Sequence, residues 1–320
     1  MKIKHSLVVP CYNEEGNVEE FLHQAKKAMS NYTDSYEIVF VNDGSKDRTP
    51  DVLKKLFNEN KELNIKVINF SRNFGKEAAM YAGLSNSSGE YVTIIDADLQ
   101  QDPEYAVEMA RILDENPDCD MVAAFQNERK EGKAISKLKR MFYKFIDRFS
   151  DIDFISDASD FRTMRRSVVE TILSLTEYQR FSKGIFSWIG YNTVSIPYDV
   201  KERQSGETKW SFVKLVKYAL EGIFAYTNLP LKIPYFLSSC AFIVSVILFT
   251  AFCILDYYIV DGVYAYGYII SAILFVSSVI LFVQGVICSY ISRIHTQVKN
   301  RPIFIAKEIL TYEHDKDSHN

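Results

Sequence analysis

The amino-acid sequence predicts an α/β fold with a mostly parallel sheet, followed by a juxtamembrane amphipathic helix and two transmembrane helices. Apolar strand-like segments alternate with amphipathic helix-like segments early in the chain, and this alternation is typical of layered α/β folds. Polar clusters follow the strands, at the ends where parallel sheets bind ligands. Two long runs without charged side chains lie in the last third of the 320 residues.

Each expected strand is a short apolar run that stops at a polar turn. In chain order, the strand-containing segments are HSLVVPCYNEE, YEIVFVNDGSKDRT, IKVINFSRNFGK, EYVTIIDADLQ and CDMVAAFQNER. Helical spacing of apolar residues predicts helices between them in VEEFLHQAKKAM, PDVLKKLFNEN, EAAMYAGLSNS and PEYAVEMARILDENP. Pro50 begins the second of these helices, because the first helical turn needs no amide donor.

The region before the charge-free runs is less regular. SKLKRMFYKFIDRF is expected to form a basic amphipathic helix, and DASDFRTMRRSVVETILSL to join an acidic turn to a strand and a helix. RFSKGIFSWIGYNTVSIPYDVKERQSGETKW is expected to give an aromatic helix, a strand and a basic loop. Residues 209–230 have the aromatic, aliphatic and Lys content of a helix at a membrane surface. The tail after Glu308 is expected to be disordered.

Two charge-free runs are long enough to cross a bilayer as helices. No Asp, Glu, Lys, Arg or His lies between Lys232 and Asp256, or between Asp261 and Arg293. About 20 apolar residues suffice for one span. The expected organisation, in chain order, is an N-terminal domain 1–208, interfacial helices 209–230, spans 233–259 and 264–291, and a cytosolic tail 292–320.

The charges around these runs predict their orientation. Lys and Arg gather on the outer flanks, whereas the short connection carries only Asp256 and Asp261. The positive-inside rule therefore predicts that both termini and the N-terminal domain are cytosolic and that the connection lies outside. No signal peptide is expected, because the first apolar stretch is short and has no small-residue cleavage site.

Composition argues against several classes of protein. The net charge of -4 does not favour binding to nucleic acid. The five Cys show no paired spacing, which argues against disulfides and a zinc site. No His lies between His23 and His295, so a His-based triad is not expected in the main domain. The chain has neither GxxxxGK[ST] nor GxGxxG, so neither a P-loop nor a dinucleotide site is supported.

One apolar run, YVTII, stops at Asp96 and is followed by Asp98 and Gln100. A polar turn that ends a strand would explain them, since Asp is a common turn former. In an extended chain, however, residues two apart point to the same side, so both carboxylates can face one point. Such oxygen ligands suit Mg²⁺ or Mn²⁺, and a nucleotide diphosphate would complete the coordination. A binding crevice is favoured because the polar clusters all follow strands: 11–15, 42–47, 71–76, 96–100 and 126–129.

Seven short segments occur in a fixed order: VVPCYNEE, VNDGSKDRT, SRNFGKEAA, DADLQ, SDFR, RFSKG and SGETKW. With the two predicted spans, they resemble glycosyltransferase family 2, whose members have the GT-A fold, a Rossmann-like nucleotide-sugar domain. Within that family the chain is similar to the polyisoprenyl-phosphate glycosyltransferases, which include dolichol-phosphate mannose synthase and bacterial undecaprenyl-phosphate glucosyl- and N-acetylglucosaminyltransferases. The resemblance runs over nearly the whole chain.

The resemblance implies roles for particular residues. Those expected to bind the UDP-sugar donor are Pro10, Tyr12, Glu14, Asp43, Lys76, Asp96 and Arg129. Those expected to bind Mg²⁺ or Mn²⁺ are Asp96, Asp98 and Gln100. Those expected to act in catalysis or near the acceptor are Asp157, Asp160, Arg203 and Lys209. Asp157 and Asp160 are alternatives for the acid that faces the acceptor. A solvated juxtamembrane cluster would also explain Arg203 and Lys209.

The implied reaction is inverting transfer of a hexose, glucose or N-acetylglucosamine, from a UDP-sugar to undecaprenyl phosphate. It would take place at the cytoplasmic face of a bacterial inner membrane, and the family suggests a homotetramer. A phosphate monoester is largely dianionic at pH 7, so the acceptor needs no strong base. The metal and the Arg and Lys side chains are then expected to provide most of the rate.

Two alternatives remain open. A processive polysaccharide synthase would use the same fold and metal, but YQRFSKGIFSW lacks its QxxRW motif, and two spans cannot enclose a channel alone. A catalytically inactive membrane scaffold would have no reason to keep both carboxylates of DADLQ.

Overall fold

The computed structural model describes residues 3–126, 158–178, 180–199 and 265–312, with a few isolated positions between 240 and 250. The chain divides into two compact units. The first consists of residues 1–144, 152–212 and 302–320, and the second of residues 145–151 and 213–301.

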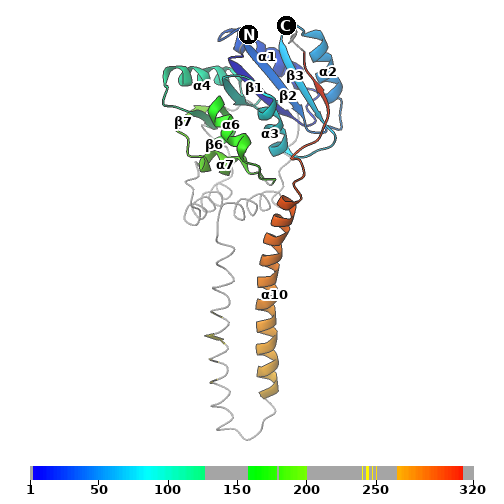
Figure 1. Cartoon of the computed structure of the whole chain (residues 1–320), viewed down its shortest axis with the longest axis vertical. Helices are drawn as coiled ribbons and strands as arrows, with labels where there is room; N and C mark the ends of the chain where they lie inside the picture. The colour runs from blue at the N-terminus through cyan, green and yellow to red at the C-terminus, as the bar shows by residue number, and fades with distance from the viewer. Residues whose placement is uncertain are drawn as a thin grey trace, which may run out of the picture. The chain divides into compact units, whose positions relative to one another are not determined.

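An eight-stranded sheet with the order β7-β5-β6-β4-β1-β2-β3-β8 forms the centre of the first unit (Figure 1). Its strands are β1 His5–Cys11, β2 Tyr36–Asn42, β3 Asn64–Phe70, β4 Tyr91–Ile94, β5 Met121–Gln126, β6 Ala158–Arg165, β7 Thr193–Tyr198 and β8 Ala306–Leu310. The pairs β1–β2, β1–β4, β2–β3 and β5–β7 are parallel, whereas β6 and β8 are antiparallel to their neighbours. The predicted α/β fold with a mostly parallel sheet is therefore confirmed.

Helices cover both faces of this sheet. Those described in the first unit are α1 Val18–Ser30, α2 Thr49–Glu59, α3 Lys76–Asn86, α4 Pro103–Glu115, α6 Arg166–Ser174 and α7 Ser182–Trp188. Helix α1 contacts α2 and α4 on one face, whereas α3 packs on β1 and β2 and contacts α6 on the other. Because both faces are covered, β2 is buried along its whole length, and its residues 38–41 form a continuous apolar run.

Strand β6 enters the sheet between β4 and β5, antiparallel to both. Thr163 Oγ1 lies 2.7 Å from Thr93 Oγ1, which in turn lies 2.7 Å from His5 Nε2. This chain of hydrogen bonds crosses three strands in the buried centre, where burial lowers the pKa of His5 to about 3 and keeps it neutral. The antiparallel direction places Asp160 beyond the carboxyl end of β4.

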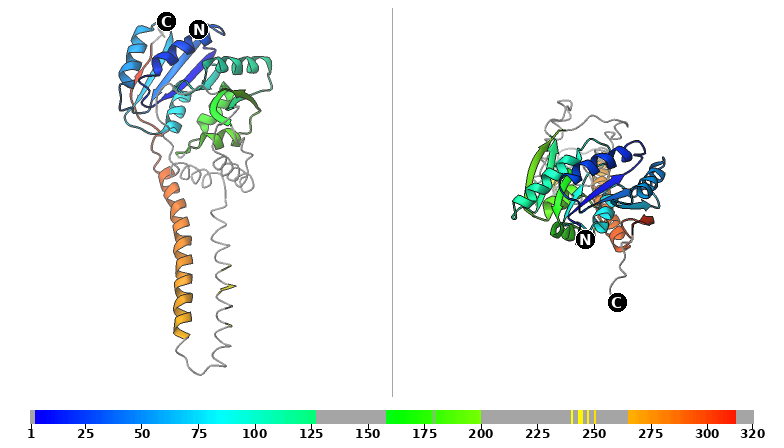
Figure 2. Two further views of the ribbon diagram at one scale, coloured as in Figure 1. Left: turned by 180° about the vertical axis from the view of Figure 1, so that it is seen from behind. Right: turned by 90° about the horizontal axis from the view of Figure 1, so that it is seen from above.

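The prediction of disorder after Glu308 is wrong for the next four residues. Strand β8 continues to Leu310 and pairs with β3 at the edge of the sheet, as Figure 2 shows in red. Tyr312 stacks on Phe57, with 4.2 Å between ring centroids, and donates a hydrogen bond to the Phe57 carbonyl. The polar composition of the tail led to the prediction of disorder. The strand that pairs with the tail lies far away in the sequence, so no local pattern indicated the pairing.

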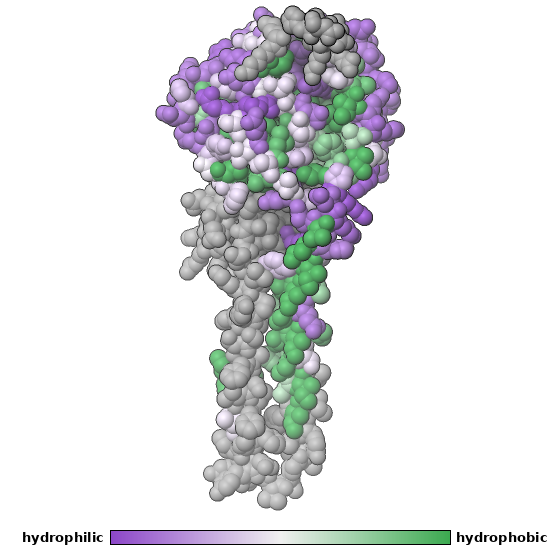
Figure 3. Space-filling model, viewed as in Figure 1, coloured by the Kyte–Doolittle hydropathy of each residue, from purple (hydrophilic) through white to green (hydrophobic). Residues whose placement is uncertain are grey.

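In the second unit, α10 runs from Ala265 to Val298. Its segment Phe275–Val298 is long and apolar enough to cross a membrane, by length and composition, and Figure 3 shows the apolar side chains along it. The helix continues beyond the predicted span 264–291. The span was predicted to end where charged and polar residues begin, but such residues are compatible with a helix. Helix α10 ends before Asn300, which has φ 46. The predicted span 233–259 lies almost entirely outside the described residues.

Candidate active site

The loops after β1 and β2 are joined by hydrogen bonds at the carboxyl edge of the parallel strands. Asn13 N donates to Ser45 Oγ at 3.0 Å, and Lys46 N donates to Asn13 Oδ1 at 2.9 Å. Glu14 N donates to Thr49 Oγ1 at 2.9 Å. Asn13 has φ 56, a left-handed conformation that Asn adopts at low cost. The first two predicted polar clusters therefore form one connected surface.

The loop after β3 is held by Asp43, whose side chain is buried. Its carboxylate accepts hydrogen bonds from Phe74 N at 2.7 Å and from Gly75 N at 3.0 Å. Burial raises the pKa of the Asp43 carboxyl, and the two amides partly offset that effect. Gly44 has φ 61, and a Cβ there would collide with the Arg72 backbone. Asp43, predicted to bind uridine, thus fixes the backbone that leads into α3.

Lys76 is the first residue of α3, and its ammonium group joins two carboxylates, one from the turn after β4 and one from β6. Nζ lies 2.8 Å and 2.9 Å from the two oxygens of Asp96, and 3.1 Å from Asp160 Oδ2. Partial desolvation of Nζ lowers the pKa of Lys76, but the carboxylates of Asp96 and Asp160 raise it by more, so the pKa lies above its usual value and the side chain stays charged. Burial likewise raises the pKa of Asp160, but Lys76 and the more distant Lys183 and Arg162 lower it below its usual value. The structure therefore brings the predicted donor-side and acceptor-side acids together.

The acidic turn has a geometry that the sequence did not predict. Strand β4 ends two residues before Asp96, and the two residues after Asp96 form a turn. Leu99 adopts φ 61 and is held there by burial, at 3 % exposure. Asp98 accepts from Gln100 N at 3.2 Å, and Gln101 Oε1 accepts from Asp96 N at 2.9 Å. The extended conformation on which the expected convergence of the two carboxylates was based is therefore not present, because residues 97 and 98 form a turn, and the convergence itself stays a prediction.

The chemistry of these donors fits a divalent cation that arrives with a nucleotide. Within the described ranges, no three His, Cys, Asp or Glu side chains are grouped so that they alone could hold a metal ion. Asp96 and Asp98 are partly exposed, and each has carboxylate oxygens that can serve as metal ligands. Mg²⁺ commonly takes one or two carboxylates together with phosphate oxygens. The site therefore suits a shared cation better than a protein cage, and metal binding by Asp96, Asp98 and Gln100 stays a prediction.

Glu77 follows Lys76 directly and fixes α7, the helix that carries the RFSKG motif. Ser182 N donates to the two Glu77 carboxylate oxygens at 3.0 Å and 3.1 Å, and Ser182 Oγ donates to Glu77 as well. Ser182 begins α7, where backbone amides have no partner inside the helix, so Glu77 caps that helix from α3. Burial raises the pKa of the Glu77 carboxyl. Glu77 was not among the predicted site residues, and its one signal in the sequence is its place in SRNFGKEAA.

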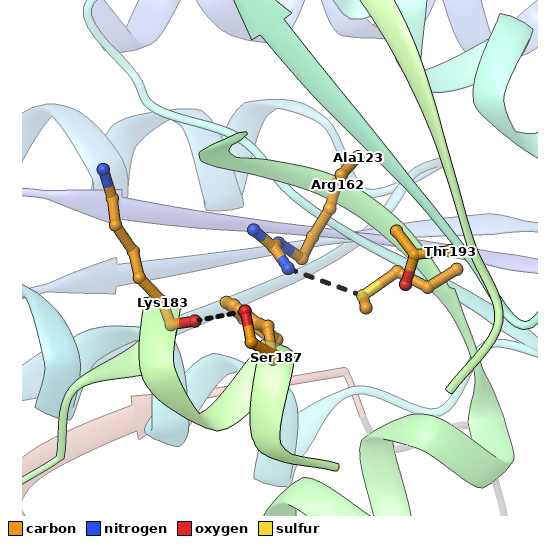
Figure 4. Close-up of a pocket in the computed structure, with 7 residues that line it drawn as sticks. Ala123, Arg162, Lys183, Ser187 and Thr193 are labelled. Atoms are coloured by element: carbon orange, nitrogen blue, oxygen red, sulfur yellow. Dashed lines mark hydrogen bonds between the residues drawn. The ribbon is translucent and has the colours of Figure 1, made fainter. Parts of the chain in front are cut away.

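Arg162 and Lys183 line a small pocket with Ser187 and Thr193 (Figure 4). Arg162 is 3 % exposed, and its Nη2 donates to the Ser159 carbonyl at 2.7 Å. Its Nε has no hydrogen-bond partner in the described part of the chain. Asp160, two residues before Arg162 in the chain, has its ion pair with Lys76.

Other predicted residues are placed less directly. Pro10 belongs to β1, and Tyr12 follows the strand, both partly exposed. The carboxylate of Glu14 accepts from Asn17 Nδ2 at 2.7 Å. The predicted residues that lie outside the described ranges are Arg129, Asp157, Arg203 and Lys209.

Comparison with known proteins identifies the family. Residues 6–173 match the family described as glycosyl transferase family 2. The chain is 38% identical over 317 residues to an uncharacterized glycosyltransferase of Synechocystis sp., with 98% of each chain covered. It is 37% identical over 314 residues to the SfII prophage-derived bactoprenol glucosyl transferase of Shigella flexneri, with 96% of this chain and 98% of the relative covered. It is 36% identical over 315 residues to the prophage bactoprenol glucosyl transferase homolog of Escherichia coli, with 96% and 99% covered.

The family match spans more than half of the chain, and these relatives align over nearly their full length. The matched region contains the acidic turn, the Lys76 bridge and most of the sheet that positions them. As its ordered sequence segments predicted, the chain belongs to glycosyl transferase family 2.

Proposed function

We propose that this protein transfers a hexose, glucose first among the candidates, from a UDP-sugar to a polyprenyl phosphate such as undecaprenyl phosphate. The observation that carries the proposal is the Lys76 bridge, because it joins Asp96 of the acidic turn to Asp160 of the inserted strand in one site. The similarity to proteins named bactoprenol glucosyl transferases supports both the lipid acceptor and glucose.

The proposed reaction is a single displacement. A phosphate oxygen of the lipid attacks the anomeric carbon, the bond from that carbon to the diphosphate breaks, and UDP leaves with inversion. A Mg²⁺ or Mn²⁺ ion held by Asp96 and Asp98 would neutralise charge on the leaving diphosphate. Asp160 would orient the acceptor side, and an Asp carboxyl at its ordinary pKa is already ionised at pH 7. A strong base is not needed, since the second pKa of a phosphate monoester is near 6.

The membrane part of the proposal explains how an acceptor with a long apolar chain reaches the site. We expect two spans, with both termini and the N-terminal domain in the cytoplasm of a bacterium. The apolar segment of α10 supports one span. The distribution of Lys and Arg around the two runs supports the orientation.

The direct test is transfer by the purified chain. We expect radiolabel from UDP-glucose to enter the lipid extract when undecaprenyl phosphate and Mn²⁺ are both present, and to stay in the aqueous phase when either is omitted. UDP-N-acetylglucosamine and UDP-galactose run in parallel identify the donor sugar. Label that enters a polymer instead of a lipid would favour a processive synthase, and no transfer from any donor would favour an inactive scaffold.

Orientation is tested separately by labelling single cysteines in intact cells. A Cys placed at Gly262, in the connection between the runs, should react with an impermeant thiol reagent. A Cys placed at Ser45, in the loop after β2, should react only after the cells are opened. The reverse pattern would contradict a cytosolic site and thus a cytosolic UDP-sugar donor.

A further inference from the structure

The Lys76 ammonium group occupies the Asp96 carboxylate, which is one of the groups expected to bind a divalent cation. Both oxygens of Asp96 lie within 2.9 Å of its Nζ, and Asp160 Oδ2 lies 3.1 Å from it. The single positive charge of Lys76 therefore already forms ion pairs with both carboxylates. A cation that coordinated Asp96 while Lys76 stayed in place would stand beside a like charge in a partly shielded site, where repulsion is strong.

The Lys76 side chain can leave these carboxylates, although its backbone cannot move. The side chain is 43% exposed, and its four-carbon stem is flexible. The preceding backbone is fixed, because Asp43 accepts the amides of Phe74 and Gly75. The ammonium group can therefore move only within the reach of one lysine. Phosphate oxygens of a donor at this edge of the sheet would be the strongest new acceptors within that reach.

We propose that Lys76 is a built-in competitor of the metal ion. It holds Asp96 and Asp160 until the donor binds, and it moves to the donor phosphates when diphosphate and cation enter together. This inference rests on the proposed function and adds an order of binding to it, because the cation does not bind stably without nucleotide. Asp160 is released by the same movement, so the acceptor side is completed only when the donor is in place.

This order of binding is tested by measuring the affinity of the full-length chain in detergent for Mn²⁺. The EPR signal of the free ion decreases as the ion binds. The wild type should bind Mn²⁺ weakly alone and tightly with UDP. Lys76→Met has a similar length without the charge, and it should bind Mn²⁺ alone about tenfold more tightly than the wild type. In this variant, UDP should increase the affinity for Mn²⁺ much less than it does in the wild type. Lys76→Arg should behave like the wild type, and Lys27→Met, on the exposed face of α1, controls for loss of a charge elsewhere.

Equal affinity of the wild type and Lys76→Met for Mn²⁺ alone would overturn the proposal. If Lys76→Met does not fold, because two carboxylates are left without a cation, the double variant Lys76→Met/Asp160→Asn takes its place with the same expected tenfold change. Asp96→Asn distinguishes failure of the proposed metal site from failure of the proposed role of Lys76. If this variant binds Mn²⁺ with UDP as well as the wild type, the proposed metal site is wrong. If it does not, and the wild type still binds Mn²⁺ tightly alone, only the competing role of Lys76 is wrong.

Discussion

Asp98→Asn should abolish sugar transfer while leaving the fold intact. Asn keeps an oxygen that can accept from Gln100 N, the contact that Asp98 makes at 3.2 Å, so the turn should persist. The substitution removes one negative charge from the proposed cation site, and the leaving diphosphate then loses much of its neutralisation. We expect a fall in turnover on the order of 10³-fold, in line with removal of a main electrostatic group from an active site.

Transfer of label from UDP-sugar to the lipid extract measures the effect, and the thermal unfolding midpoint shows whether the variant is folded. Asp34→Asn, at an exposed position before β2, is the matched control and should keep full activity. Excess EDTA should reproduce the loss in the wild type. A folded Asp98→Asn protein with normal turnover, or a wild type that is indifferent to EDTA, would contradict the metal site.

The second large effect is expected on stability, from removal of the chain after Arg301. This truncation deletes β8 and leaves β3 as an unpaired edge strand. In the full-length chain, Ile68 of β3 pairs with Ile309 of β8. The truncation also deletes Tyr312, which stacks on Phe57. Tyr312 is partly buried against the core, and loss of it together with the whole strand should lower the unfolding midpoint by roughly 10 °C or more.

Thermal unfolding in detergent compares three chains. One is full-length, one ends at Tyr312, and one ends at Arg301. Deletion of residues 313–320 alone should leave the midpoint unchanged, whereas the shorter chain should unfold earlier and aggregate through its exposed edge. The truncation should also impair transfer, because Ser71 N, at the start of the loop that leads to Lys76, donates to the Ile305 carbonyl at 3.0 Å. If the chain ending at Arg301 melts like the full-length protein, β8 does not stabilise the sheet.

Much of the fold could be predicted from local patterns. Apolar runs such as YEIVFVN and the amphipathic spacing of VEEFLHQAKKAM follow from the periodicity of strands and helices, and the structure has both elements there. The acidic turn was recognisable because Asp96 and Asp98 directly follow a buried strand. The family could be predicted because seven short segments keep their order along the chain.

Only the tertiary structure decided which distant residues meet. No local pattern shows that β6 enters between β4 and β5, and this insertion is what brings Asp160 to Lys76. The pairing of β3 with β8 joins residues more than 200 positions apart, so the polar tail gave no sign of it. Periodicity reports which face of an element is buried, whereas neighbours in a sheet are selected by the packing of the whole unit. The sequence by itself therefore determined the element types, the acidic turn and the family, and the tertiary contacts determined the lysine bridge between the two acids.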